Sequence, residues 1–221
     1  DDQTLIYGLG AIKGVGEGAI QSILDVRAAQ GTPKDLFDFC CQVDLRRVNR
    51  RVLDALIKSG GFDAWEVSRS TLSASIEKAM QQGAEYHSNQ NTGQGDLFDM
   101  LDEADAPAPY TEMPEWTSKQ RLDAEKETLG FYWSGHPALI YQEELGALIT
   151  PIAALAESTL KKVRLCALVR GLRRIMTKRG KQLLILSLED GSGVIDAVAF
   201  SEGIDAAETP PVAGEMIVLD G

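Results

Sequence analysis

The sequence of 221 residues has few of the residues that bind metals or form cross-links, and it has no long apolar run. Three cysteines are present, two of them adjacent, together with two histidines, His87 and His136. No C-x-x-C spacing occurs, so we expect no zinc site, and free thiols are typical of a reducing cytoplasm. We also expect no membrane span and no signal peptide, because neither apolar pattern is found. These absences favour a globular cytoplasmic protein.

Acidic side chains outnumber basic ones, and the formal net charge is −11, but the excess lies in the middle of the chain. Residues 63–160 carry five basic and seventeen acidic side chains, whereas residues 1–62 carry eight of each. An acidic total argues against nucleic-acid binding. Residues 161–181, however, contain nine basic side chains and no acidic one, and an arginine cluster lies near the start of the chain. Local charge therefore leaves nucleic-acid binding open.

A glycine-rich turn lies between two short apolar helical patterns in YGLGAIKGVGEGAI, residues 7–20. Glycine permits a tight turn and close approach of a ligand, and the amides that open a helix attract anions. We predict a helix-hairpin-helix in which Val15 anchors the turn in the core. The DNA phosphate is expected at Lys13, Gly14, Val15 and Gly16. An ordinary glycine turn is the alternative, since a lone G-x-G is weak evidence. Gly18 replaces a basic residue of the generic motif, which predicts weaker anion binding.

A second helix–turn–helix follows the first. One helix is predicted from Leu36 and another over 48–57, which ends at Gly60-Gly61 as a C-terminal glycine pair favours. The polar turn between them is rich in arginine rather than glycine. We expect its basic side chains to bind DNA as well: Arg46, Arg47, Arg50 and Arg51. The natural inference is a pair of helix-hairpin-helix motifs packed together.

The middle of the chain changes character after residue 82. A helix over 69–82 is predicted from apolar residues at four-residue spacing, but residues 83–115 are rich in polar residues, Gly and Pro, which is typical of a flexible linker. Thr117 and Gln120 fit a capping box, which predicts a helix to about Leu129. Irregular structure is expected from His136 onwards.

The period changes to that of strands from about residue 163. Strands over 163–175, 183–188 and 194–200, a short helix over 201–207 and a strand over 216–219 match the order of an OB-fold, a small barrel that binds oligonucleotides. A fifth strand is missing. No aromatic residue occurs within 163–199, so we expect weak contacts, mainly with phosphates, through this segment's basic side chains. The candidates are Arg173, Arg174, Lys178, Arg179 and Lys181.

The predicted fold class is therefore a multidomain α+β protein. Its expected parts are a tandem helix-hairpin-helix all-α domain (1–65), a connecting helix (66–82), a flexible acidic linker (83–115), a helical segment (116–160) and a truncated OB-fold β-barrel (161–221).

Several blocks, in this order, resemble the alpha subunits of bacterial DNA polymerase III, the replicative C-family polymerases. They are YGLGAIKGVGEGAI, LFDFC with VDLRRVNRRVLDALIKSGGFD, EKETLGFYWSGHP and MTKRGK with LEDGSG. The resemblance covers nearly the whole chain and fits the replicative subunit better than the error-prone paralogue. Trp133 stands where the family more often has an aliphatic or small residue.

The resemblance implies a role for a pentapeptide within the linker. Family members carry a Gln-x-x-Leu-Phe-type motif that inserts into a groove of the sliding clamp, and this role is carried to Gln94, Asp96, Leu97 and Phe98. From the residues alone, a docking peptide and a segment folded back onto a neighbouring helix remain equal alternatives. The resemblance further implies a grip on duplex DNA by the hairpin at 13–16, and single-stranded template near the OB segment.

Catalysis is not expected from this segment. Nucleotidyl transfer needs carboxylates that hold two Mg²⁺ ions, whereas the acidic residues of the linker have no scaffold. By resemblance, the parent polymerase uses Mg²⁺ and catalytic residues upstream of Asp1. Other replicase subunits are expected partners, and the bacterial cytoplasm at the nucleoid is the expected location. Two alternatives remain: a stand-alone, non-enzymatic nucleic-acid-binding adaptor, and a protein-interaction scaffold whose basic clusters only solvate its surface.

Overall fold

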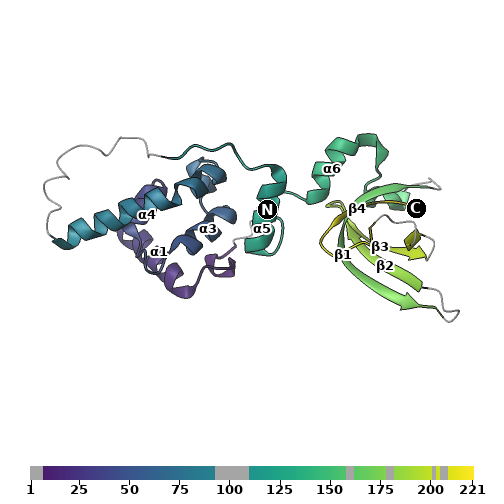
Figure 1. Cartoon of the computed structure of the whole chain (residues 1–221), viewed down its shortest axis with the longest axis horizontal. Coiled ribbons are helices and arrows are strands. Elements are labelled where there is room, and N and C mark those ends of the chain that lie inside the picture. The colour runs from purple at the N-terminus through teal and green to yellow at the C-terminus, as the bar shows by residue number, and fades with distance from the viewer. Residues whose placement is uncertain (1–6, 93–109, 158–161, 178–181, 201–202, 205–208) are drawn as a thin grey trace. The chain divides into compact units, whose positions relative to one another are not determined.

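The computed structural model describes residues 7–92, 110–157, 162–177, 182–200, 203–204 and 209–221. The chain divides into two compact units, residues 1–132 and 133–221 (Figure 1). The first unit is helical and the second contains a β-sheet. The chain thus combines α-helical and β-sheet units, as the sequence predicts.

Short helices around an apolar core make up the first unit. Its elements are η1 (Leu9–Ala11), α1 (Glu17–Gln30), α2 (Leu36–Gln42), α3 (Arg50–Lys58), η2 (Asp63–Trp65), α4 (Arg69–Thr92) and α5 (Ser118–Leu129). Helices α1 to α3 supply most of the buried apolar side chains, and α4 packs against α2 and α3. The largest fully buried side chains include Leu36, Leu53, Leu56, Ile57 and Leu72.

The helix ends follow the local signals in the sequence. Asp35 opens α2 by accepting a hydrogen bond from the amide of Asp38, and Asn49 opens α3 by accepting from two amides of its first turn. The capping box predicted at Thr117 and Gln120 is confirmed at the start of α5. Gly130, with a φ of 86°, ends that helix in the left-handed conformation that favours glycine.

Helix α4 continues to Thr92, so the prediction that this helix ends at residue 82 was wrong. Two contacts with distant residues explain the extension. At Gly83 a Cβ atom would overlap the carbonyl oxygen of Cys40, so only glycine allows α4 to lie this close to α2. One turn later, Nε2 of His87 bonds the carbonyl oxygen of Val43 at 3.1 Å. The polar sequence of this half gave no periodic signal for either contact.

Residues 110–116, predicted to belong mostly to a flexible linker, are instead packed on the first unit. The ring of Tyr110 contacts Phe37 edge-on at 5.3 Å, and its hydroxyl accepts from the amide of Leu36. The amide of Met113 donates to the hydroxyl of Thr71 at 3.0 Å. This extended segment therefore returns the chain to the surface of α2 and α4 before α5 begins.

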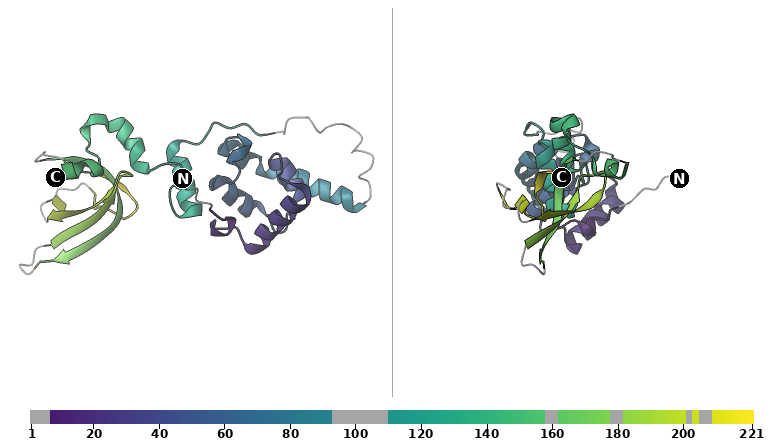
Figure 2. Two further views of the ribbon diagram at one scale, coloured as in Figure 1. Left: turned by 180° about the vertical axis from the view of Figure 1, so that it is seen from behind. Right: turned by 90° about the vertical axis from the view of Figure 1, so that its right-hand side faces the viewer.

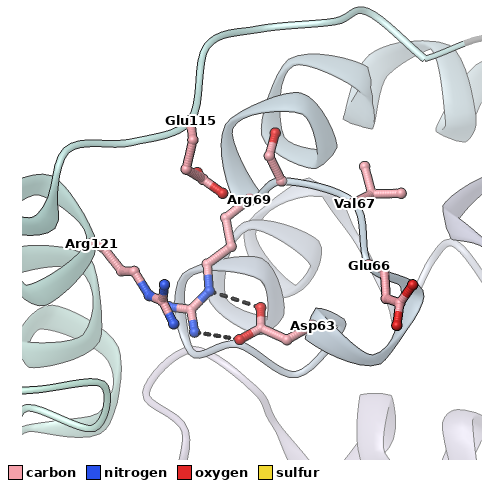
Figure 3. Close-up of a pocket in the computed structure, with 7 residues that line it drawn as sticks. Asp63, Glu66, Val67, Arg69, Glu115 and Arg121 are labelled. Atoms are coloured by element: carbon pink, nitrogen blue, oxygen red, sulfur yellow. Dashed lines mark hydrogen bonds and ion pairs between the residues drawn. The ribbon is translucent and has the colours of Figure 1, made fainter.

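A buried ion pair joins α4 to α5. The side chain of Arg69 is 4% exposed and that of Glu125 is 0% exposed, and Nη1 of Arg69 donates to the Glu125 carboxylate at 3.0 Å. Arg69 also forms a two-bond contact with Asp63, at 2.8 and 2.6 Å (Figure 3). Burial acts to lower the pKa of Arg69, but the hydrogen bonds and charges of these two carboxylates outweigh burial and raise it.

The same side chains line a polar pocket. Figure 3 shows Arg121 from α5 pointing toward Arg69, with Glu115 above them and Glu66 on the opposite rim. Three carboxylates and two guanidinium groups line this pocket, so it contains charges of both signs. We interpret the pocket as the open edge of the ion-pair cluster rather than as a ligand site.

The second unit contains a four-stranded antiparallel sheet with the order β3-β2-β1-β4. Its elements are α6 (Pro137–Leu145), η4 (Gly146–Leu148), η5 (Ile152–Glu157), β1 (Arg164–Met176), β2 (Gln182–Glu189), β3 (Val194–Phe200) and β4 (Met216–Asp220). The pairing of β1 with β2 shifts between Val169 and Gly171, and such a bulge bends a strand. The sheet curls into a half-barrel, as the views in Figures 1 and 2 show.

Asp190, in the turn between β2 and β3, connects the sheet to η5 by hydrogen bonds. Its carboxylate accepts from the amide of Ile152 at 2.8 Å and from the amide and hydroxyl of Ser192. Burial acts to raise the pKa of Asp190, but these hydrogen bonds, the Ile152 amide first, outweigh burial and lower it. Ile152 is thereby held against the apolar inner face of the sheet.

The prediction of irregular structure from His136 was wrong, because α6 begins at Pro137. His136 accepts from the amide of Ala138 through Nδ1 at 3.1 Å, and proline suits the first position of a helix. An imidazole cap is rarer than a hydroxyl or carboxylate cap, so the sequence signal was weak. The helix predicted over 201–207 lies mostly outside the described residues, and residues 203–204 are helical.

Replacing Glu125 by Gln should destabilise the first unit by about 3 kcal/mol, because Arg69 would lose the buried one of its two carboxylate partners. Urea unfolding followed by circular dichroism measures the change. Glu127→Gln on the same helix is the matched control, since its carboxylate pairs with Lys58 at 3.1 Å at the surface. The control should cost less than about 1 kcal/mol. Equal losses of stability in the two variants would contradict a special role for the buried pair.

Candidate nucleic-acid interface

The first hairpin joins η1 to α1 and has the geometry that the glycine pattern predicts. Gly14 has a φ of 97°, a conformation that favours glycine, and Val15 is buried in the core with 7% of its surface exposed. Gly16 precedes α1, and no side chain caps the amides that open this helix of 14 residues. Uncapped amides at a helix start carry a partial positive charge and point away from the helix. This hairpin can therefore receive an anion.

The second hairpin joins α2 to α3 without glycine. The carbonyl oxygen of Asp44 accepts from the amides of Arg47 at 2.9 Å and Val48 at 2.8 Å, which closes the turn. Val48 is fully buried and Asn49 caps α3. Arg50 then opens α3, where a positive side chain opposes the helix dipole. Arg50 therefore does not stabilise α3 through the helix dipole, whereas its charge is favourable for a negatively charged ligand.

The two hairpins lie side by side. A Cβ atom on Gly14 would lie 3.9 Å from Nε of Arg51, and one on Gly18 would lie 3.9 Å from Cδ of Arg47. Arginine side chains of the second hairpin thus reach the glycine backbone of the first. The structure brings together predicted residues that are more than thirty positions apart in the sequence.

Carboxylates partner most of these arginines. Asp44 pairs with Nε of Arg46 at 3.1 Å and with Nε of Arg47 at 3.7 Å, while Glu77 of α4 pairs with Arg50. Hydrogen bonds from the side chain and then the amide of Arg46 lower the pKa of Asp44. For Arg51, no ion pair is found within the described part of the chain. The basic surface is therefore partly neutralised by the protein itself.

The last residues of helix α5 bind the segment of the first hairpin through hydrogen bonds. The amide of Lys13 donates to the carbonyl oxygen of Thr128 at 2.9 Å. The hydroxyl of Tyr7 donates to the carbonyl oxygen of Leu129 at 3.3 Å. The Lys13 amide is thus used within the fold, so only its ammonium group remains to contact a ligand. Local sequence patterns gave no signal for this support, because the two segments lie more than a hundred residues apart.

In the second unit, Arg173 and Arg174 lie on β1 as predicted for the basic strand, and both are exposed. Because side chains alternate along a strand, the two arginines belong to opposite faces of the sheet. The other three predicted basic residues, Lys178, Arg179 and Lys181, lie outside the described residues. So do all four residues of the predicted clamp motif: Gln94, Asp96, Leu97 and Phe98.

An apolar row crosses the outer face of this sheet beside Arg173. Ile175 pairs with Leu183, and Leu183 pairs with Phe200; in the next row, Arg173 and Val198 flank Ile185. Phe200 is 64% exposed. The aromatic-free stretch noted in the sequence ends at residue 199, one position before Phe200. The alternation of β3 puts Phe200 in phase with the exposed Val198, and this signal could have identified it.

The remaining residue types to consider are those that act as nucleophiles or metal ligands. Burial raises the pKa of Cys40 to about 12 and that of Cys41 to about 11, so neither thiol is a nucleophile at neutral pH. Across the described residues, no three His, Cys, Asp or Glu side chains are grouped so that they could hold a metal ion. Nor does any described helix have the length and apolar character of a membrane span.

Comparison with known proteins agrees with this geometry. A family model described as a helix-hairpin-helix motif matches residues 1–72. The DNA polymerase III subunit alpha of Vibrio cholerae is 39% identical over 100% of this chain, that of Haemophilus influenzae 40% over 98%, and that of Escherichia coli K12 32% over 100%. The chain spans about a fifth of the length of these relatives (19%, 19% and 20%).

Proposed function

We propose that this chain, which belongs to the family of bacterial DNA polymerase III alpha subunits, forms a DNA-binding and clamp-binding part of a replicative polymerase. In this proposal the paired hairpins hold duplex DNA, and the second unit contacts single-stranded template. The full-length polymerase extends a primer by template-directed nucleotidyl transfer in the bacterial cytoplasm, together with other replicase subunits. Carboxylates outside this chain hold the Mg²⁺ ions of that reaction.

The observation that carries the duplex-binding proposal is the meeting of two anion-attracting groups on one surface. Uncapped amides open α1, and Arg47 and Arg51 lie against the same hairpin. Amides receive one phosphate through short hydrogen bonds, while guanidinium groups reach neighbouring phosphates through longer side chains. Such contacts touch the backbone of DNA rather than its bases, so binding is independent of sequence.

The stand-alone adaptor is the less favoured alternative. An adaptor built from the same helix-hairpin-helix and OB modules would be similar to the polymerase subunits over those modules alone. Similarity to them instead extends over 98–100% of the chain, through both units. This extent supports the polymerase assignment over the adaptor and the protein scaffold.

Changing Arg47 and Arg51 together to Ala should weaken duplex binding at least tenfold at about 100 mM salt, and the dependence of log affinity on log salt should fall by about 0.9 for each phosphate that the variant no longer neutralises. Fluorescence anisotropy with two unrelated duplexes measures both quantities. Arg27→Ala/Lys34→Ala removes the same charge near the far end of α1 and should change affinity little. If both double variants bind alike, or if only one duplex is bound, the hairpin proposal fails.

For the second unit, we propose an OB-like surface that stacks bases on Phe200 and holds phosphates with Arg173. Phe200→Ala should reduce affinity for a thymidine oligonucleotide about tenfold, the scale of a single base–aromatic stack. Leu148→Ala is the control, because Leu148 is equally exposed, at 65%, on η4 of the same unit. Equal affinities of the two variants would refute base stacking on Phe200. Binding would then depend on phosphate contacts only, as the sequence indicates.

The clamp proposal depends on Leu97 and Phe98, whose apolar side chains would fill pockets of the ring-shaped sliding clamp. Leu97→Ala/Phe98→Ala should abolish micromolar binding to a bacterial clamp, measured by surface plasmon resonance. Met100→Ala/Leu101→Ala removes a similar apolar pair in the same segment and should retain most of the affinity. Absence of binding by the unmodified chain to an active clamp would refute this part of the proposal.

A further inference from the structure

The hairpin surface, formed by Arg46, Arg47, Arg50 and Arg51, has three of its arginines paired with carboxylates, and one of these pairs contributes little to folding. In the ion pair between Arg50 and Glu77, the two side chains are 65% and 74% exposed. Ion pairs with this exposure contribute little to folding because water and salt screen them. Glu77 belongs to α4, a different element from the hairpins, and its carboxylate is directed at an arginine of the proposed DNA surface. Folding stability therefore does not explain this pairing.

Asp44 repeats the arrangement within the second hairpin. Its carboxylate contacts both Arg46 and Arg47, and the Arg46 side chain is held by two bonds, at 3.1 and 3.3 Å. A DNA phosphate that approaches this hairpin must replace the carboxylate or share its guanidinium groups. The carboxylate is held at a high effective concentration by the chain, so it competes strongly with a free ligand.

The first hairpin has a related feature. Glu17 is the first residue of α1, so a carboxylate lies next to the amides that would receive a phosphate. Gly18 also replaces the basic residue that the generic motif has there. Both hairpins thus combine an anion-attracting group with a neighbouring negative charge.

We propose that Asp44 and Glu77 limit the affinity of the hairpin surface for duplex DNA by competing with phosphates for the arginines. The inference rests on the proposed duplex binding. A phosphate that contacts Arg46, Arg47 or Arg50 replaces an internal ion pair, so the net gain from that contact is small and the contact is released easily. A protein that binds DNA without sequence preference and moves along it benefits from contacts of this kind, because re-formed internal pairs lower the cost of each step.

The test compares Glu77→Gln with Glu85→Gln in the full 221-residue chain. Both residues lie on α4, both changes remove one negative charge, and the Glu85 carboxylate accepts from Gln81 rather than from an arginine. At about 50 mM salt, Glu77→Gln should raise duplex affinity about threefold to tenfold and slow dissociation, whereas Glu85→Gln should have a smaller effect. The gain should shrink as salt rises, since salt screens the competing pair as well.

A second pair of variants separates competition from positioning. In an Arg50→Ala background, Glu77→Gln should produce no gain beyond that of Glu85→Gln, because the arginine that Glu77 blocks is absent. If Glu77 instead positions Arg50 for a phosphate, Glu77→Gln will weaken binding, and this result would overturn the inference. Asp44→Asn, which keeps an oxygen for the Arg46 amide, should also strengthen binding.

The outcomes distinguish this inference from the function on which it rests. If Arg47→Ala/Arg51→Ala loses duplex affinity but Glu77→Gln and Glu85→Gln bind alike, the hairpins bind duplex DNA as proposed. The proposal that carboxylates limit this affinity is then wrong. If the arginine variant binds as tightly as the unmodified chain, duplex binding by the hairpins is wrong and the affinity limit is wrong with it.

Discussion

The buried ion pair between Arg69 and Glu125 is the contact on which the first unit depends. It joins the first residue of α4 to α5, and Asp63 completes the set of charges. Two buried charges are costly unless they are paired and hydrogen-bonded, so the pair tolerates few other arrangements of the two helices. The end of α5 in turn bonds the amide of Lys13 through Thr128. The glycine hairpin is therefore held by a segment that follows it by more than a hundred residues.

This dependence explains why the first unit extends well beyond the matched motif. The helix-hairpin-helix model ends at residue 72, whereas the compact unit continues to Tyr132. Leu129 lies in the same apolar core as Val15, and Tyr110 packs against that core from the returning segment. The motif alone would leave these apolar surfaces open to water. Residues 110–132 complete a core that the two hairpins only begin.

Local patterns in the sequence predicted the elements whose cause is local. Glycine at a positive φ, the Thr117 cap and the alternation of the strands each depend on neighbours within a few residues. The extension of α4, the packing of residues 110–116 and the start of α6 depend on distant or unusual partners. From the sequence alone, Gly83 indicates the end of a helix. The structure shows that this glycine instead allows the backbone of Cys40 to pack against α4. The same distinction holds for the candidate site, where the sequence predicted a role for the arginines and the structure shows the carboxylates that pair with three of them.

A chain with a net charge of −11 is an unusual candidate for DNA binding, and the distribution of its charges resolves the difficulty. Exposed charges influence one another over about 8–10 Å at physiological salt, so the carboxylates in direct contact with the hairpin arginines matter more there than the net charge of the whole chain. Those carboxylates are Asp44 and Glu77, and they reduce the positive field of the arginines without removing it. Tight binding would oppose movement along DNA, whereas several weak contacts in one chain can together keep the DNA bound. Partial neutralisation of the hairpin arginines therefore supports the proposal that this surface binds DNA weakly enough to move along it.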